Sequence, residues 1–164
     1  MKGQKELYEL LDKLGIVYEY HEHPPLATIE EAIIHWKDYN SGRCKNIFFR
    51  NHKGNRHYLV ILEHLRQLDI HDLEKRLRQG KLTFASDQRL MRYLGVEPGS
   101  VSPFGLINDR EKHVHLFIDE KLDEFDRLAF HPNVNTASLV ISKEDFLKFE
   151  KPIDDASFVI IKRR

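Results

Sequence analysis

A stretch rich in glycine and proline, residues 95–105, has the composition of a segment that shapes a site for chemistry. It holds three of the chain's eight glycines and two of its six prolines. Glycine permits positive φ and a close approach of the backbone to a ligand, whereas proline fixes φ and removes an N–H donor. We therefore expect a shaped loop whose backbone N–H groups can face a ligand. An ordinary surface turn is the alternative, and the loop composition alone favours it.

Lys45 and His131 are the polar side chains outside this loop with the clearest chemical potential. Lys45 precedes the apolar run 47–49, where its ammonium could meet a phosphate or an ester as a point charge. His131 lies in the turn-rich segment 131–136, and the proline that follows it restricts its backbone. Taken alone, such a histidine is more often structural than functional.

The motifs exclude several familiar kinds of site. The sequence has ten histidines, but it contains no HExxH or Cys/His zinc spacing, no GxSxG elbow and no glycine pattern of a nucleotide-binding loop. Its one cysteine, Cys44, has basic neighbours that could lower the thiol pKa, but a lone cysteine is more often a small buried hydrophobe. We therefore expect no protein nucleophile, no metal and no cofactor.

Composition and charge bound the class of protein. With 164 residues, 41% hydrophobic and 32% charged, the chain is predicted to form one globular domain, residues 1–164. The formal net charge is zero, so any attraction for nucleic acid must be local. Basic residues gather in the segments 43–56 and 75–92, where Asp87 is the one acid. On one face these segments would bind phosphate; otherwise they are solvated strand and helix faces. No membrane span or signal peptide is evident, which favours a cytoplasmic location.

Hydrophobic spacing and capping residues predict the elements that position these side chains. Leu7, Leu10, Leu11 and Leu14 give a helix over 4–14, and Thr28, Asp69, Ser86 and Ser142 cap four more. The segments 45–50 and 58–62 form a predicted hairpin. Further strands are expected at 16–20, 82–85, 114–118, 128–130, 138–141 and 158–161. Because helices and strands do not alternate strictly, the fold class is α+β, a mixed and mainly antiparallel sheet flanked by helices.

Several separated motifs resemble, in this order, the bacterial free-standing prolyl-tRNA editing deacylases of the YbaK and prolyl-tRNA synthetase insertion-domain superfamily, the ProX or PrdX type. The resemblance covers about residues 5–150. The matching motifs are His23-Pro24-Pro25 with Thr28 and Glu30-Glu31-Ala32, Lys45-Asn46 with Phe48-Phe49-Arg50, Leu82 to Ser86 with Arg89-Leu90, the loop 95–105 with Leu106 to Asp109, and His131-Pro132 with Asn135-Thr136.

This resemblance implies hydrolysis of the ester that joins a wrong amino acid, chiefly alanine, to proline tRNA. A bound water would attack, and backbone N–H groups of the glycine-rich loop would stabilise the oxyanion. The implied catalytic residues are Lys45, His131, Gly99 and Ser100. The implied substrate-binding residues are Thr28, Asn46, Gly95, Pro98, Phe104 and Asn135. The predicted tRNA-binding residues are Arg43, Arg50, Lys53 and Arg89. The expected partner is the acceptor end of a mischarged tRNA; a partnership with prolyl-tRNA synthetase is left open, and no membrane partner is expected.

Two other functions remain open at this point. The pocket could sense an amino acid or an aminoacyl nucleotide without turnover, or it could deacylate a different mischarged tRNA, one carrying cysteine or serine. Discrimination against proline would need a pocket too small to admit it. The apolar residues Ile47, Phe49, Leu62 and Phe104 are candidates for its walls, and each is equally well explained as core.

Overall fold

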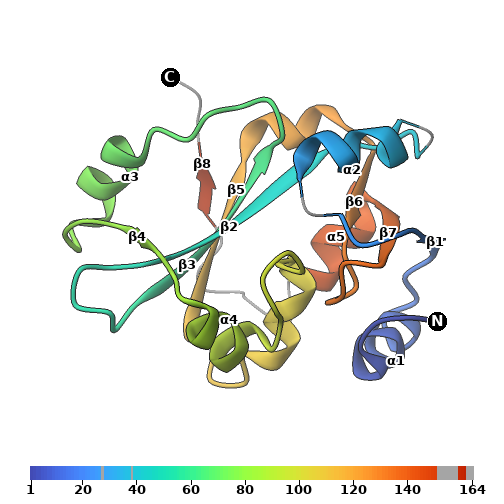
Figure 1. Ribbon diagram of the computed structural model, residues 1–164, viewed down its shortest axis with the longest axis horizontal. Helices are drawn as coiled ribbons and strands as arrows, with labels where there is room; N and C mark the ends of the chain where they lie inside the picture. The colour runs from blue at the N-terminus through green and yellow to red at the C-terminus, as the bar shows by residue number, and fades with distance from the viewer. Residues whose placement is uncertain (27, 38, 151–158, 162–164) are drawn as a thin grey trace.

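Two β-sheets form the framework of the molecule (Figure 1). The computed structural model describes residues 1–26, 28–37, 39–150 and 159–161. One sheet is antiparallel with the order β1-β7-β6, and its strands span Tyr18–Glu22, Ala137–Ser142 and Arg127–Phe130. The other is mixed with the order β4-β2-β3-β5-β8, and its strands span Thr83–Phe84, Cys44–Arg50, His57–Glu63, Val114–Asp119 and Val159–Ile161. The α+β class is confirmed, with two sheets in place of the one expected.

The helices begin where the capping chemistry predicts. Side-chain oxygens of Thr28, Asp69 and Ser86 accept hydrogen bonds from backbone N–H groups in the first turn of α2, α3 and α4. The described residues form five α-helices: α1 (Lys5–Lys13), α2 (Ile29–Trp36), α3 (Ile70–Leu77), α4 (Asp87–Leu94) and α5 (Lys143–Glu150). Two 3-10 helices follow, η1 (Pro103–Asn108) and η2 (Glu120–Glu124). No helix in the described part of the chain is long and apolar enough to cross a membrane.

Three segments differ from the sequence prediction. The first strand continues to Glu22, because its pairing with β7 lasts until Ala137, just before the two prolines. No element was predicted between the strands at 114–118 and 128–130, but η2 forms there and buries Leu122. The second half of the loop 95–105 winds into η1, whose Phe104 is fully buried. The prediction of a strand at 158–161 is confirmed for 159–161, and residue 158 lies outside the described residues.

The main hydrophobic core lies between the two sheets. Alternate residues of β2 and β3, such as Phe48 and Leu59, face this core together with Leu94 of α4 and Leu139 of β7. The opposite face of β2 and β3 packs against α3. A third cluster joins Trp36 and Ala32 of α2 to the outer face of β6 and β7. The order of layers is therefore α2, three-stranded sheet, main core, five-stranded sheet and α3.

The two sheets meet where β2 and β6 begin. The Gly42 N–H donates to the Arg127 carbonyl at 2.7 Å, and Gly42 forms a parallel bridge with Leu128. A β-carbon on Gly42 would lie 2.7 Å from the ring of Phe125, so the approach requires glycine. Because this bridge fixes how β2 lies beside β6, it also fixes how the residues that follow in each strand are placed.

Phe104 of η1 gives a test of how firmly the loop is anchored. Its ring lies edge-on to Phe130 and Phe149, at centroid distances of 5.8 and 5.0 Å. Phe104→Ala should lower the free energy of unfolding by about 3–5 kcal/mol, because a buried aromatic ring leaves a cavity. Phe84→Ala is the matched control, since Phe84 is 70% exposed. Denaturant titration checks this, and equal losses in the two variants would contradict the anchoring of the loop through Phe104.

Candidate active site

The glycine-rich loop 95–105 lies against the turn-rich loop 131–136. The Asn135 Nδ2 is 3.5 Å from the position that a β-carbon on Gly99 would occupy. The Gln4 side chain, just before α1, exchanges two hydrogen bonds with the Asn108 amide and accepts a third from the Asn133 Nδ2. These three hydrogen bonds of Gln4 therefore tie the two loops to each other.

The His131 imidazole has a defined tautomer. Its Nδ1 lies 2.9 Å from the Ala137 carbonyl oxygen, which can only accept, so Nδ1 carries the proton and Nε2 carries a lone pair. Burial lowers the pKa of His131, and the neighbouring His23 lowers it further, while the bond to Ala137 opposes both. The ring is therefore neutral near pH 7, and its Nε2 can accept a proton or a hydrogen bond.

His23 and Ser138 form the polar surroundings of His131, and the sequence analysis assigned neither of them a role in the site. The His23 Nδ1 donates to the Pro24 carbonyl at 2.9 Å, so its Nε2 accepts from the Ser138 hydroxyl at 2.8 Å. The His23 and His131 rings are 5.8 Å apart. A repeated His-Pro dipeptide, at 23–24 and 131–132, was the available signal. Both His23 and Ser138 are buried, so they position His131 and are poorly placed to meet a substrate themselves.

Lys45 and His131 each follow the side of their strand that faces away from the main core. In β2, Cys44 and Phe48 face the main core, so Lys45 faces the outer side; in β6, Phe130 faces the core and His131 follows on the outer side. Gly42 and Leu128 form one isolated parallel bridge, so the chain runs from it in the same direction into β2 and along β6. Lys45 is partly buried, and within the described residues its ammonium has no ion pair or hydrogen bond.

Asn46 was expected to bind substrate beside Lys45, but the two side chains point to opposite faces of β2. Successive residues of a strand point to opposite faces, so Asn46 faces the main core side of β2. Its buried Oδ1 has no hydrogen-bond partner among the described residues. Such an oxygen commonly binds an ordered water or a ligand group. The role of Asn46 in substrate binding stays a prediction, in which Asn46 and Lys45 would act from opposite sides of β2.

Residues 97–100 form a type II turn. The Ser100 N–H donates to the Glu97 carbonyl at 3.1 Å, Pro98 occupies the second position, and Gly99 has φ of 87°. The Ser100 N–H is therefore engaged and Ser100 itself is buried, which disagrees with its predicted role as an oxyanion donor. Gly99 is exposed at the tip of the turn, next to Asn135, and Pro98 is exposed beside it.

Comparison with known proteins identifies the family. Residues 23–149 match the model of the aminoacyl-tRNA editing domain. The chain belongs to this family. It is 39% identical over 154 residues to the prolyl-tRNA editing protein ProX of Acetoanaerobium sticklandii, with 92% of each chain covered. It is 35% identical to the mouse prolyl-tRNA synthetase associated domain-containing protein 1, covering 89% of this chain and 88% of the relative. A solved structure, described as a candidate trans-editing enzyme for prolyl-tRNA synthetase, has the same fold, with a TM-score of 0.70, 18% identity, and 99% and 100% of the two chains covered.

Three predicted substrate-binding residues of this editing domain have structural roles in the fold. Gly95 ends α4 in the left-handed conformation, and the Asn108 amide occupies the place of its missing β-carbon. Phe104 is fully buried in the core, so it cannot line a pocket in this conformation. Thr28 caps α2, although it remains exposed. Of the apolar wall candidates, Phe49 and Leu62 are also core residues, and Ile47 alone is partly accessible.

Two of the predicted tRNA-binding arginines make contacts inside the fold. Arg89 donates to the Gly54 carbonyl at 2.8 Å and lies 2.9 Å from the His57 Nε2. Arg50 donates to backbone carbonyls of the hairpin turn, at 3.2 and 3.4 Å. Both guanidinium groups therefore stabilise the turn between β2 and β3. Lys53 is exposed on that turn and Arg43 lies at the far end of β2, where both remain open to a ligand.

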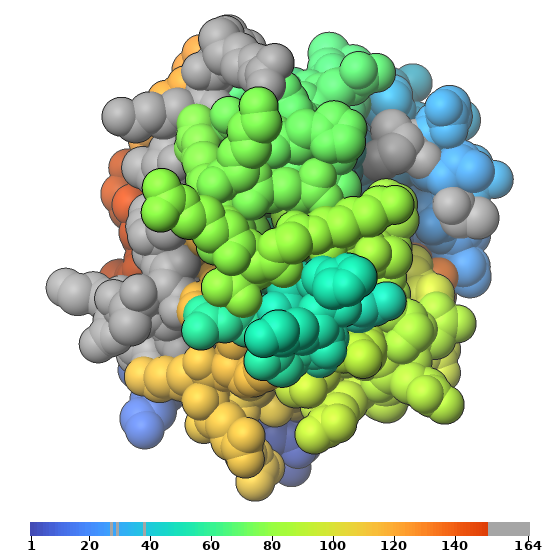
Figure 2. Space-filling view, turned by 90° about the vertical axis from the view of Figure 1, so that its left-hand side faces the viewer, coloured from blue at the N-terminus to red at the C-terminus, as the bar shows by residue number. Residues whose placement is uncertain are grey.

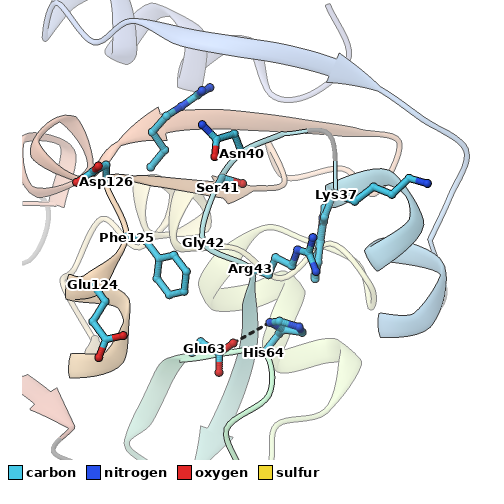
Figure 3. Close-up of a pocket in the computed structure, with 12 residues that line it drawn as sticks. Lys37, Asn40, Ser41, Gly42, Arg43, Glu63, His64, Glu124, Phe125 and Asp126 are labelled. Carbon is cyan, nitrogen blue, oxygen red and sulfur yellow. Dashed lines mark ion pairs between the residues drawn. The ribbon is translucent and has the colours of Figure 1, made fainter.

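A cavity of about 570 Å³ lies between the end of α2 and η2 (Figure 3). Figure 3 shows Lys37 and Arg43 on one side of it, and Glu124 and Asp126 on the other. The His64 Nδ1 and the Glu63 Oε1 are 2.9 Å apart, a distance of an ion pair without the angles of a hydrogen bond. Of the predicted site residues, only Arg43 lines this cavity. The cavity therefore adjoins the Lys45 side of β2 without containing the Lys45–His131 pair.

The contact between Arg89 and His57 predicts a pH-dependent stability. His57 is fully buried, and burial, then His113 and Arg89, lowers its pKa from 6.5 to about 4. Between pH 4 and pH 6.5 the unfolded chain binds a proton at His57 and the folded chain does not. The contribution of His57 to the free energy of unfolding is therefore fully present above pH 6.5 and is lost as the pH falls through 4. The loss amounts to up to about 3 kcal/mol.

Unfolding free energies measured from pH 7 to pH 4 test this. The His57→Gln variant keeps an amide that can accept from Arg89 but does not titrate, so its profile should be flatter by a comparable amount. Parallel profiles for the two proteins would contradict a buried neutral His57.

Proposed function

We propose that this protein hydrolyses the ester of alanine wrongly attached to proline tRNA. The observation that carries the proposal is the presence of two unlike groups that face away from the main core, on strands joined by the Gly42–Leu128 bridge. Lys45 offers a positive charge that has no counter-ion among the described residues, and His131 offers an Nε2 lone pair, in a chain of the aminoacyl-tRNA editing domain family. The name of the ProX relative, a prolyl-tRNA editing protein, supports proline tRNA as the RNA.

The reaction needs a water molecule and an acceptor for its proton. The water oxygen attacks the ester carbonyl carbon, the carbonyl oxygen becomes an oxyanion, and the bond to the ribose oxygen then breaks. The His131 Nε2 accepts the proton of the water, directly or through a ribose hydroxyl, and the proton passes to the departing ribose oxygen. The Gly99 N–H and the Lys45 ammonium are the groups available to stabilise the oxyanion or to hold the terminal phosphate.

The burial of the possible nucleophiles supports a bound water as the attacking group. Cys44 is buried, and burial, then the charges of Glu63 and Asp119, raises the pKa of its thiol far above neutrality. A thiol in this state is a poor nucleophile. Ser138 is also buried and donates to His23, away from solvent. Water therefore remains the simplest nucleophile for the ester.

Selection of alanine over proline follows from size. A synthetase pocket built for proline cannot reject the smaller alanine strongly, because missing methylene groups change binding by only about 1–3 kcal/mol. A second, smaller pocket that excludes proline solves the problem by hydrolysing what fits. The exposed Pro98 and Gly99 at the turn, with Asn135 opposite, give such a pocket rigid walls.

Substitution of Lys45 tests the central claim. Lys45→Ala should lower kcat/KM for release of alanine from alanylated proline tRNA by about 100- to 1,000-fold, the usual effect of removing one oxyanion-stabilising group. Lys13→Ala is the control, because Lys13 is exposed on α1, away from the site. Release of labelled alanine is the measurement. Retention of full activity by Lys45→Ala would remove Lys45 from the mechanism.

The pH profile tests the role of His131. Its neutral form accepts the proton, and burial holds its pKa below the ordinary 6.5, so kcat/KM should be level above about pH 6.5 and fall below it. His131→Gln should be slower and should lack this fall. A wild-type midpoint above 6.5, or the same profile in His131→Gln, would contradict the assignment.

A panel of mischarged tRNAs tests the substrate. We expect fast release of alanine from proline tRNA and no release of proline from the same tRNA, since proline exceeds the pocket. Cysteine- and serine-carrying tRNAs complete the panel. Preferential release of cysteine or serine would overturn alanine as the substrate. Thermal stabilisation by free alanine without hydrolysis of any ester would identify a binding module instead.

A further inference from the structure

Four cationic side chains gather around the turn between β2 and β3, at the end of β2 opposite to Lys45. They come from the two basic segments of the sequence and are exposed to solvent. We call them the basic hairpin surface, which consists of Lys53, Arg56, Arg78 and Lys81. Figure 2 shows the hairpin turn in teal lying directly against green residues of the α3–α4 region on one face of the molecule.

Backbone and side-chain contacts hold the two segments together. The His52 N–H donates to the Gln79 carbonyl at 3.3 Å, and a β-carbon on Gly80 would lie 2.8 Å from the His52 Cβ. From the other side, the Arg89 guanidinium donates to the Gly54 carbonyl at 2.8 Å. The turn is thus clamped between the chain after α3 and the side chain from α4. Arg50 and Arg89 hold the turn through hydrogen bonds to its backbone carbonyls. The four cations of the basic hairpin surface have no ion pair among the described residues.

The charge of this surface is not neutralised by its neighbours. Within the described residues, none of the four cations has an ion pair, whereas Arg76 nearby pairs with Asp72 at 3.1 Å. The two basic segments contain one acid, Asp87. Because the whole chain has a net charge of zero, this local excess is matched by acids elsewhere. A clustered patch of unpaired Lys and Arg is the usual electrostatic footprint of a phosphate backbone.

The position of the surface indicates which part of an RNA it can reach. Lys45 and Arg50 are five residues apart in β2, which spans about 17 Å at the rise of a strand, and the turn lies beyond Arg50. A nucleotide whose ester lies at Lys45 cannot touch the turn. RNA duplex farther from the ester can, since double-stranded RNA is bound mainly through its phosphates and ribose hydroxyls.

We propose that the basic hairpin surface binds the phosphate backbone of the double-helical acceptor arm of the tRNA. This inference rests on the proposed function for the identity of the RNA. It assigns Lys53, Arg56, Arg78 and Lys81 to affinity for the duplex, and it assigns Lys45, at the other end of β2, to the terminal nucleotide. Contacts of this kind hold the RNA in register and do not read its sequence.

The test compares binding of uncharged proline tRNA by the wild-type protein and by a variant with Lys53→Gln, Arg56→Gln, Arg78→Gln and Lys81→Gln. Fluorescence anisotropy over a range of salt concentrations gives Kd and its salt dependence. Each lost phosphate contact lowers the slope of log K against log salt by about 1, so the variant should bind at least about 10-fold more weakly with a slope smaller by about 4. The control variant carries Lys5→Gln and Lys13→Gln on α1, on the opposite side of the molecule (Figure 1), and should match the wild type.

Hydrolysis of two substrates separates this inference from the proposed function. The quadruple variant should lose activity on full-length alanylated tRNA at subsaturating concentration, yet keep the wild-type rate on an alanylated CCA trinucleotide, which has no duplex. Unchanged tRNA affinity and slope in the quadruple variant would overturn the inference, as would an equal loss on the trinucleotide. If the quadruple variant lost binding to anionic vesicles but bound tRNA as the wild type does, the surface would be assigned to a membrane instead. Failure of the wild type to hydrolyse either substrate would reject the proposed function, whereas the anisotropy result would still decide the RNA surface.

Discussion

The hydrogen bond from the Gly42 N–H to the Arg127 carbonyl, at 2.7 Å, is the contact on which the candidate site depends. It joins the segment just before β2 to the first residue of β6, and these two strands belong to different sheets and are more than seventy residues apart in the chain. The Phe125 ring covers Gly42 so closely that any side chain there would collide with it. The chain leaves this junction in the same direction in both strands, and Lys45 and His131 follow it on the sides that face away from the main core.

A second constraint acts on the loops that complete the site. Gln4 binds Asn108 and Asn133, and Asn133 also donates to the Phe104 carbonyl at 3.3 Å. The beginning of the chain therefore fastens η1 and the loop 131–136 together. The type II turn at 97–100 is held at its other side by Gly95 and the end of α4. Rigid support of this kind suits a site that works by placing an ester, since much of the rate gain of such a site comes from positioning.

Basic residues and histidines that look alike in the sequence have different roles in the structure. The guanidinium groups of Arg50 and Arg89 donate hydrogen bonds to backbone carbonyls of the hairpin turn. The Lys45 ammonium has no ion pair or hydrogen bond among the described residues. Burial keeps His57 and His131 neutral, so both serve as hydrogen-bond acceptors near pH 7. The unpaired cations that remain lie outside the core, where they keep their hydration and stay available to a polyanion.

The sequence by itself determined the elements, the caps, the hairpin and the shaped turn, because these depend on neighbours within a few residues. Thr28, Asp69 and Ser86 cap the predicted helices, and Pro98-Gly99 forms the turn their conformational preferences require. The motifs in order also indicated the family. Only the tertiary structure decided that Phe104 is core, that Arg89 is internal, that Asn46 faces away from Lys45, and that His23 and Ser138 back His131. Those outcomes depend on contacts between segments distant in the chain. Residue type and spacing do not show which of these distant segments a side chain will contact.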